Sequence, residues 1–266
     1  MRKIFVILAL ASFCAAYGQD RLFNYTYQSG VLNKGQKELE VWSTMHNGRT
    51  NYYRGFDHRL EFETGLGGNL QTAFYLNYGY STGIEDNNGV QSLNNSSEFS
   101  FSNEWKYKMS DPVANALGSA LYFEYTLSPT DAELEGKIIL DKQIGKTTHA
   151  FNLVGEYEFS KEFNNLGNKI TTASQRELKV ELNYAFAYKI KDGLSAGLEV
   201  FNENQFSPSS KWENSILSLG PCVSYSTNGF WVNLTVMPQI TNLKGGGLDL
   251  IEHEKLQTRL AFSFAI

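Results

Sequence analysis

The chain contains 266 residues, of which 23 are basic and 28 acidic, so its formal net charge is −5. A surface that binds nucleic acid neutralises phosphates with Lys and Arg, and the acidic excess argues against such a partner. The hydrophobic fraction of 42% and mean hydropathy of −0.33 resemble those of soluble proteins. A membrane barrel has similar averages, because lipid-facing residues alternate with polar ones. The aromatic fraction of 14% favours the barrel, since Tyr and Trp form belts at membrane interfaces.

The first residues have the pattern of a secretory signal peptide. Arg2 and Lys3 precede an apolar stretch over 4–14, and small residues at Ala16 and Gly18 fit a cleavage site after residue 18. We therefore expect residues 1–18 to be removed, which leaves a single cysteine and no internal disulfide. No other segment has the roughly 18 apolar residues of a spanning helix, so any membrane span would consist of strands.

The remaining chain is dominated by runs in which apolar and polar residues alternate, the pattern of a strand whose two faces differ. In the clearest early run, Phe56 and Phe62 lie on one face and Glu61 and Glu63 on the other. In chain order the predicted strands cover residues 37–45, 56–66, 70–80, 99–107, 117–127, 134–144, 151–159, 178–190, 194–200, 217–225, 230–237 and 256–266.

Short and long connections alternate between these runs. The tight turns follow even-numbered runs, at 67–69, 145–147, 191–193 and 226–229, and a looser connection begins at Asp111. The polar loops follow odd-numbered runs, at 82–97, 161–174, 204–214 and around 245–247. This predicts an all-β fold over residues 37–266: a closed antiparallel transmembrane β-barrel of about 12 strands with short periplasmic turns and longer extracellular loops.

Two of these predictions have alternatives, one for the fold and one for the segment before the first strand. A secreted β-sandwich would also alternate, but its strands are usually about 5–6 residues long and its loop lengths have no reason to alternate. The segment 19–36 is either a periplasmic tail or a segment that enters the lumen and partly plugs it. Pro221 and Pro238 lack a backbone donor and indicate bulges or strand ends.

Short motifs spread over most of the mature chain support a resemblance to a known family. They lie at 21–27, 34–40, 60–63, 69–71, 219–221 and 253–257. On these the chain resembles a family of uncharacterised Gram-negative outer-membrane β-barrels, and it is distantly similar to the outer-membrane transporter family of phenol-degradation clusters. The resemblance implies passage of small molecules. Alternate positions from Leu260 fit a barrel-insertion signal read by the barrel-assembly machinery, although Ile266 stands where Phe or Trp is usual.

If the polar face of each run points inward, the lumen is rich in carboxylates. The predicted lumen-lining residues are Glu38, Glu40, Arg59, Glu61, Glu63, Glu104, Lys106, Glu124, Glu156, Glu158, Lys179, Glu181, Glu199 and Arg259. Carboxylates two residues apart on a strand are about 7 Å apart and repel by roughly 2 kcal/mol at an effective dielectric near 20. The lumen must therefore be wet, or its carboxylates must be paired.

The sequence raises two further kinds of candidate site. His46 and His253 lie at the outer rim near Asp249 and Glu254 and are weak candidates for a divalent metal site, but no short ligand spacing supports it. An outer-membrane lipid hydrolase needs a serine beside an oriented histidine. The His-x-Ser-Asn-Gly pattern of such phospholipases is absent from the sequence. We therefore expect no enzyme, no catalytic residue and no cofactor.

The function that the sequence favours is a passive pore or transporter-like channel for small solutes in the cell outer membrane. An acidic lumen would favour cations or neutral molecules. A barrel filled by paired charges, with a structural or surface role and no transport, is the alternative, because about twelve strands enclose a narrow interior. The expected partners are outer-membrane lipid, the barrel-assembly machinery and small solutes.

Overall fold

The computed structural model describes residues 21–87, 90–166, 169–207 and 211–266; the predicted signal peptide lies outside them. These residues form twelve strands: β1 (Lys37–Asn47), β2 (Tyr53–Gly67), β3 (Leu70–Asn87), β4 (Val90–Ser110), β5 (Gly118–Leu127), β6 (Asp131–Ile144), β7 (Thr147–Leu166), β8 (Lys169–Lys191), β9 (Leu194–Phe206), β10 (Trp212–Thr227), β11 (Phe230–Asn242) and β12 (Leu256–Ala265). None of the described residues belongs to a helix long and apolar enough to cross a membrane.

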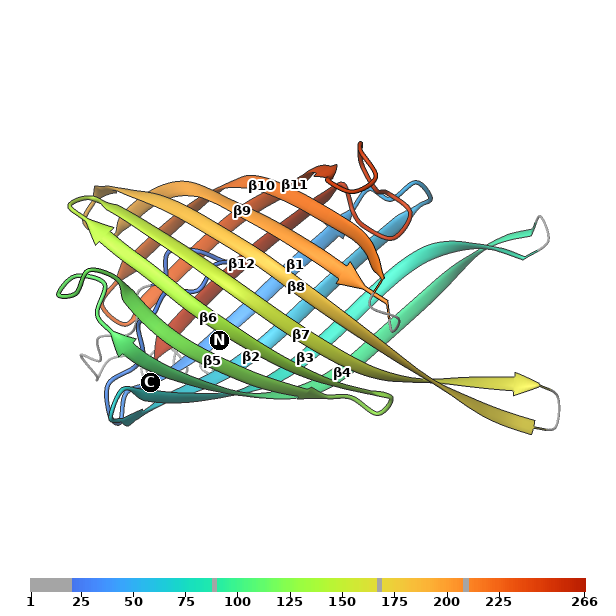
Figure 1. The fold of residues 1–266 in the computed structure, drawn as a ribbon, viewed down its shortest axis with the longest axis horizontal. Coiled ribbons are helices and arrows are strands. Elements are labelled where there is room, and N and C mark those ends of the chain that lie inside the picture. Colours follow the sequence, from blue (N-terminus) through green and yellow to red (C-terminus); the bar gives the residue numbers. More distant parts are fainter. Residues whose placement is uncertain (1–20, 88–89, 167–168, 208–210) are drawn as a thin grey trace, which may run out of the picture.

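Each strand pairs antiparallel with its neighbours in the chain, and β1 pairs with β12 to close the barrel (Figure 1). At this seam Glu38 lies opposite Ala265 and Asn47 opposite Leu256. Closure removes the edge strands, so backbone groups at membrane depth find their hydrogen-bond partners within the sheet. The prediction of a closed antiparallel barrel of about 12 strands is confirmed.

The wall separates an apolar outer face from a more polar inner face. In β5, Leu121 and Phe123 are each 47% exposed on the outer surface, whereas Ala120 and Tyr122 between them are 0% and 4% exposed. Successive side chains of a strand point to opposite faces, so the alternation in the sequence becomes a difference between lipid side and lumen side.

The two rims differ in how the strands are joined. At the inner rim the turn between β2 and β3 is tight because Gly67, Gly68 and Asn69 all adopt positive φ, from 61° to 89°. Glycine and asparagine tolerate this left-handed conformation, which explains why they occupy this hairpin turn. In outer-membrane barrels the rim with short turns faces the periplasm.

At the outer rim, the prediction of long open loops at 82–97 and 161–174 is wrong. Most of these residues are strand, and the β3–β4 and β7–β8 hairpins extend beyond the barrel wall (Figure 1). Polar side chains support the extension; for example, Thr82 Oγ1 donates to Asn95 Oδ1 at 2.8 Å. Both faces of these extensions lack lipid, so hydropathy does not alternate and the sequence pattern cannot distinguish them from loops.

The described residues before β1 lie inside the barrel (Figure 1). Phe23, Thr26 and Leu32 are at most 3% exposed, and the segment leaves the lumen at the inner rim, where Gly35 N donates to Gly65 O at 2.9 Å. Of the two alternatives for this part of the chain, the structure has the one in which it enters the lumen.

Candidate functional site

Residues 21–36, here called the plug, are held by contacts to strands all around the barrel. Phe23 fits a space bordered by the small residues Ala150, Ala185, Ala187 and Cys222, which lie on β7, β8 and β10. Small inward side chains on neighbouring strands thus leave room for one aromatic ring. Deeper along the plug, Leu32 N donates to Gln71 Oε1 on β3 at 2.8 Å.

Glu199 on β9 is the main anchor of the plug. Its carboxylate accepts hydrogen bonds from the backbone N–H groups of Asn24 at 2.9 Å, Tyr25 at 2.7 Å and Thr26 at 3.0 Å. Thr235 Oγ1 donates to the same carboxylate at 2.7 Å. Glu199 thereby binds a short stretch of plug backbone through both of its carboxylate oxygens.

A second anchor, Asn152 on β7, holds the plug by a reciprocal pair of hydrogen bonds. Tyr27 N donates to Asn152 Oδ1 at 2.6 Å, and Asn152 Nδ2 donates to Tyr27 O at 2.9 Å. The side-chain amide thereby supplies the acceptor and the donor that the backbone of a neighbouring strand would supply in a sheet. These bonds fix Tyr27 at the centre of the lumen.

Cations and aromatic rings form a layer across the lumen at this level. The guanidinium of Arg21 lies 4.3 Å from the ring centroids of both Tyr27 and Trp42, and Arg259 lies 4.1 Å from Tyr25. Lys137 Nζ lies 4.2 Å from the Tyr27 ring. Such cation–π contacts strengthen where water is excluded, so this layer attaches the plug to the wall through mutually attracting groups.

Outside this layer lies a vestibule of about 470 Å³, lined by plug residues and by the outer halves of the strands. Its lining includes three cationic side chains, Arg59, Lys137 and Arg259. Its carboxylates are more numerous: Asp57, Glu98, Glu124, Glu133, Glu135, Glu156, Glu181 and Glu203. A cavity of this volume is within the range that holds a small organic solute.

Part of the vestibule charge is paired within the wall. Lys179 Nζ lies 2.7 Å from Glu156 Oε1 and 3.8 Å from Glu158 Oε2, and Arg59 lies 3.6 Å from Glu124. The lining still has more carboxylates than cations. Some of the predicted lumen carboxylates are therefore paired with cations, while other carboxylates on the vestibule lining have no ion pair among the described residues.

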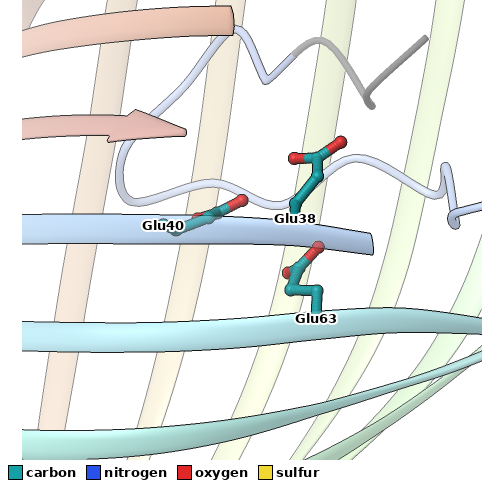
Figure 2. Close-up of side chains that lie close together, drawn as sticks. All are labelled: Glu38, Glu40 and Glu63. Atoms are coloured by element: carbon teal, nitrogen blue, oxygen red, sulfur yellow. The ribbon is translucent and has the colours of Figure 1, made fainter. Parts of the chain in front are cut away.

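Between the plug and the inner rim, carboxylates from adjacent strands meet at close range. Figure 2 shows Glu38 and Glu40 of β1 with Glu63 of β2, whose carboxylate oxygens lie within 4.8 Å of one another. All three are at most 6% exposed. Arg21 of the plug approaches Glu40 at 3.6 Å.

All the predicted lumen-lining residues are buried or half-buried, and the structure divides them into two levels. Those on the inner side of the plug are Glu38, Glu40, Glu61, Glu63, Glu104 and Lys106; Glu199 lies beside the plug; Arg59, Glu124, Glu156, Glu158, Lys179, Glu181 and Arg259 lie towards the vestibule. The sequence assigned no structural role to Asn24, Tyr27 or Asn152, since their roles depend on the path of the plug.

At the outer rim, His46 is engaged in charge pairs. His46 Nε2 lies 2.7 Å from Asp57 Oδ2, and its Nδ1 lies 3.5 Å from Glu254, which also accepts a 2.7 Å hydrogen bond from Arg49 Nε. Burial alone would raise the pKa of Glu254, but the bonds from His46 and Arg49 lower it to about 2. Among the described residues, no histidine belongs to a group of three metal-type ligands, and His253 does not join His46 in one.

Solved outer-membrane barrels have the same fold. The chain superposes on the COG4313 outer membrane channel from Pseudomonas putida F1 with a TM-score of 0.58 at 11% identity, over 92% of this chain and 100% of that one. The translocator domain of the autotransporter NalP from Neisseria meningitidis gives 0.58 at 11% identity, over 89% and 90%. The NanC porin gives 0.52 at 12% identity, over 86% and 100%.

At these identities the likeness concerns the fold alone: the chain has the closed antiparallel barrel fold of these outer-membrane proteins. No curated protein matches its sequence. The model of a family of unknown function, DUF6662, matches residues 15–266. Because this match covers nearly the whole chain, the protein belongs to the DUF6662 family.

Proposed function

We propose that this barrel is a channel for small solutes whose lumen is closed by the plug and opens when the plug moves. The observation that carries the proposal is the vestibule of about 470 Å³, which ends at residues 24, 25 and 27 of a segment held by hydrogen bonds and ring contacts. Such a segment can leave without any change in the barrel wall. The acidic lining favours cations or neutral molecules over anions.

A structural barrel without transport is the second candidate, and the same plug favours it. Residues 21–36 pack on strands from β3 to β12 and include several fully buried side chains. If the plug never leaves the lumen, the charged side chains there serve only to pair with one another and hold the barrel together. The two candidates differ in whether removing the plug opens a conducting path.

The test is single-channel recording in planar lipid bilayers, with the full barrel and with a variant that lacks residues 21–33. We expect rare or brief openings for the full barrel and steady conductance steps for the variant, because the barrel wall is hydrogen-bonded independently of the plug. Heat-modifiable migration on gels checks that both are folded. A folded variant without conductance steps would contradict the channel and support the structural barrel.

A further inference from the structure

A crevice of about 330 Å³ lies near the outer rim, between the β5–β6 turn and the base of the β7–β8 hairpin. It is lined by residues 127–132, which contain the turn, by 159–161 of β7 and by 174–176 of β8. None of these residues lines the vestibule inside the barrel. The crevice is therefore separate from the path that a solute would take through the lumen.

The floor of the crevice is a row of side chains on the lipid-facing side of the wall. Leu127 of β5 lies opposite Ala132 of β6, which lies opposite Phe159 of β7. Phe159 in turn lies opposite Arg176 of β8. Leu127 and Phe159 are 51% and 40% exposed, like the other apolar side chains of the outer face. Because Ala132 is the small residue between two large ones, a space remains above it.

The next row of the same face marks the membrane interface. It contains Tyr125 of β5 and Tyr157 of β7, which are two residues nearer the middle of the barrel than Leu127 and Phe159. The rings of Tyr157 and Phe159 meet edge to face, with centroids 4.6 Å apart. Tyrosines of the lipid-facing wall gather at the level of the lipid headgroups. The crevice therefore lies where acyl chains end and headgroups begin.

Two cationic side chains border the crevice. Lys161 of β7 lies opposite Ser174 of β8, so Lys161 and Arg176 are diagonal neighbours across the two strands. Diagonal positions are about 7–8 Å apart, which lets two long side chains reach one anion between them. Arg176 Cζ lies 6.0 Å from the centroid of the Phe159 ring, so the guanidinium lies beside the apolar floor. The crevice thus combines an apolar surface with positive charge at its edge.

This positive charge has no direct carboxylate partner. Among the described side chains, none of the carboxylates lies within ion-pair distance of Lys161 or Arg176. Asp131, the acidic residue of the lining, lies opposite Ser160 at a lumen-facing position of the alternation. Its carboxylate accepts hydrogen bonds from Ser128 Oγ at 2.8 Å and Thr130 Oγ1 at 2.6 Å, within its own turn.

We propose that this crevice binds the phosphorylated headgroup of a lipid of the outer leaflet, with the first part of an acyl chain against its apolar floor. Arg binds phosphate oxygens through its planar fork, and Lys does so as a point charge. A free anion would contact only the cations, whereas a lipid also matches the apolar row that continues into the lipid-facing wall. The site does not depend on whether the barrel conducts.

The first experiment titrates the full chain, folded in micelles of a non-ionic detergent, with lipid A, which is a phosphorylated glycolipid. Native mass spectrometry measures the bound lipid. We expect saturable binding that weakens when the phosphates of lipid A are removed enzymatically, and that inorganic phosphate at the same concentration does not displace. Equal binding of the two lipids, or displacement by inorganic phosphate at that concentration, overturns the proposal.

A double variant tests the two cations. One basic residue near a membrane surface contributes about five-fold to the binding of anionic lipid, so Lys161→Gln with Arg176→Gln should lower the affinity for lipid A by about 30-fold. The control is Arg54→Gln with Lys211→Gln, which removes the same charge from exposed positions near the outer rim that do not line the crevice. Unchanged affinity in the first variant, or equal loss in the control, overturns the assignment.

A single variant tests the shape of the crevice without changing its charge. Ala132→Leu fills the space between Leu127 and Phe159 with a side chain that still suits the lipid-facing wall. Each acyl CH₂ displaced from the floor should cost about four-fold in affinity for lipid A. Ala132→Ser is the matched control of nearly unchanged size, and heat-modifiable migration on gels checks that both are folded. Full affinity in the folded leucine variant overturns the proposed binding mode.

Discussion

Glu199 shows how much one side chain can organise in this lumen. The residue is fully buried, and among the described residues it has no Lys or Arg within ion-pair distance. Its carboxylate accepts hydrogen bonds instead from three backbone N–H groups of the plug and from the Thr235 hydroxyl. The carboxylate therefore belongs to the barrel wall, while three of these four donors belong to the plug.

We predict that Glu199→Ala loosens the plug. Three backbone donors lose their acceptor, which costs about 1–3 kcal/mol and should raise the open population by about 5- to 150-fold. The measurement is limited trypsin digestion after Arg21 in the folded barrel, together with open probability in bilayers. Glu158→Ala is the matched control, because that carboxylate lies 3.8 Å from Lys179 and, among the described residues, forms no ion pair with the plug. Equal digestion of the two variants would contradict the role of Glu199.

At the scale of the element, β10 and β11 show a local departure from regular pairing. The register shifts between Leu217 and Ser218, and regular pairing resumes at Cys222 opposite Thr235. The interval contains Pro221 on β10 and Pro238 on β11, as expected for residues without a backbone donor. Here the backbones approach so closely that a Cβ on Gly220 would lie 1.7 Å from Val236 O.

Gly220→Ala is therefore expected to destabilise the β10–β11 pair. The added methyl group has to displace backbone, which costs about 1–3 kcal/mol, and the urea midpoint of the folded, heat-modifiable gel band should fall. Gly155→Ala is the control, because a Cβ there meets nothing within 4 Å. If both alanine variants unfold at the same urea concentration as the unaltered chain, the close approach of β10 and β11 is not structurally important.

At the scale of the whole molecule, charge is distributed unevenly between surfaces. The outer wall presents exposed apolar side chains such as Leu121, Phe123 and Leu182. Many of the glutamates of the strands point into the lumen instead and are buried there. The vestibule retains more carboxylates than cations after the pairs with Lys179 and Arg59 are formed. A barrel opened by loss of the plug would therefore have a negative potential along its path.

This charge distribution predicts cation selectivity in the variant without residues 21–33. The reversal potential in a KCl gradient should show cations to be more permeant than anions. Glu133→Gln with Glu181→Gln in that background should reduce the permeability ratio by about two- to five-fold, because a charge about 4 Å away contributes about 1 kcal/mol in water. Asp192→Asn is the control; its exposed side chain lies in an inner-rim turn and pairs with Lys189. Anion preference in the unplugged barrel would contradict the prediction.

The sequence by itself determined the barrel, because strand alternation and turn residues are local properties. Period-two runs such as 56–66 specify an inner and an outer face, and residues such as Gly68 and Asn69 permit the tight turn. The inward direction of Glu61 and Glu199 follows from the same alternation. The extended outer hairpins were not predictable, because without lipid on one face their hydropathy does not alternate.

Only the tertiary structure decided what fills the barrel. Asn24 and Glu199 are 175 residues apart in the chain, and no local pattern indicates that the backbone of one binds the side chain of the other. Closure of the sheet likewise pairs Glu38 of β1 with Ala265 of β12, at the other end of the barrel sequence. Alternation fixes which face a side chain occupies, whereas its partners across the lumen depend on barrel closure and on the path of the plug.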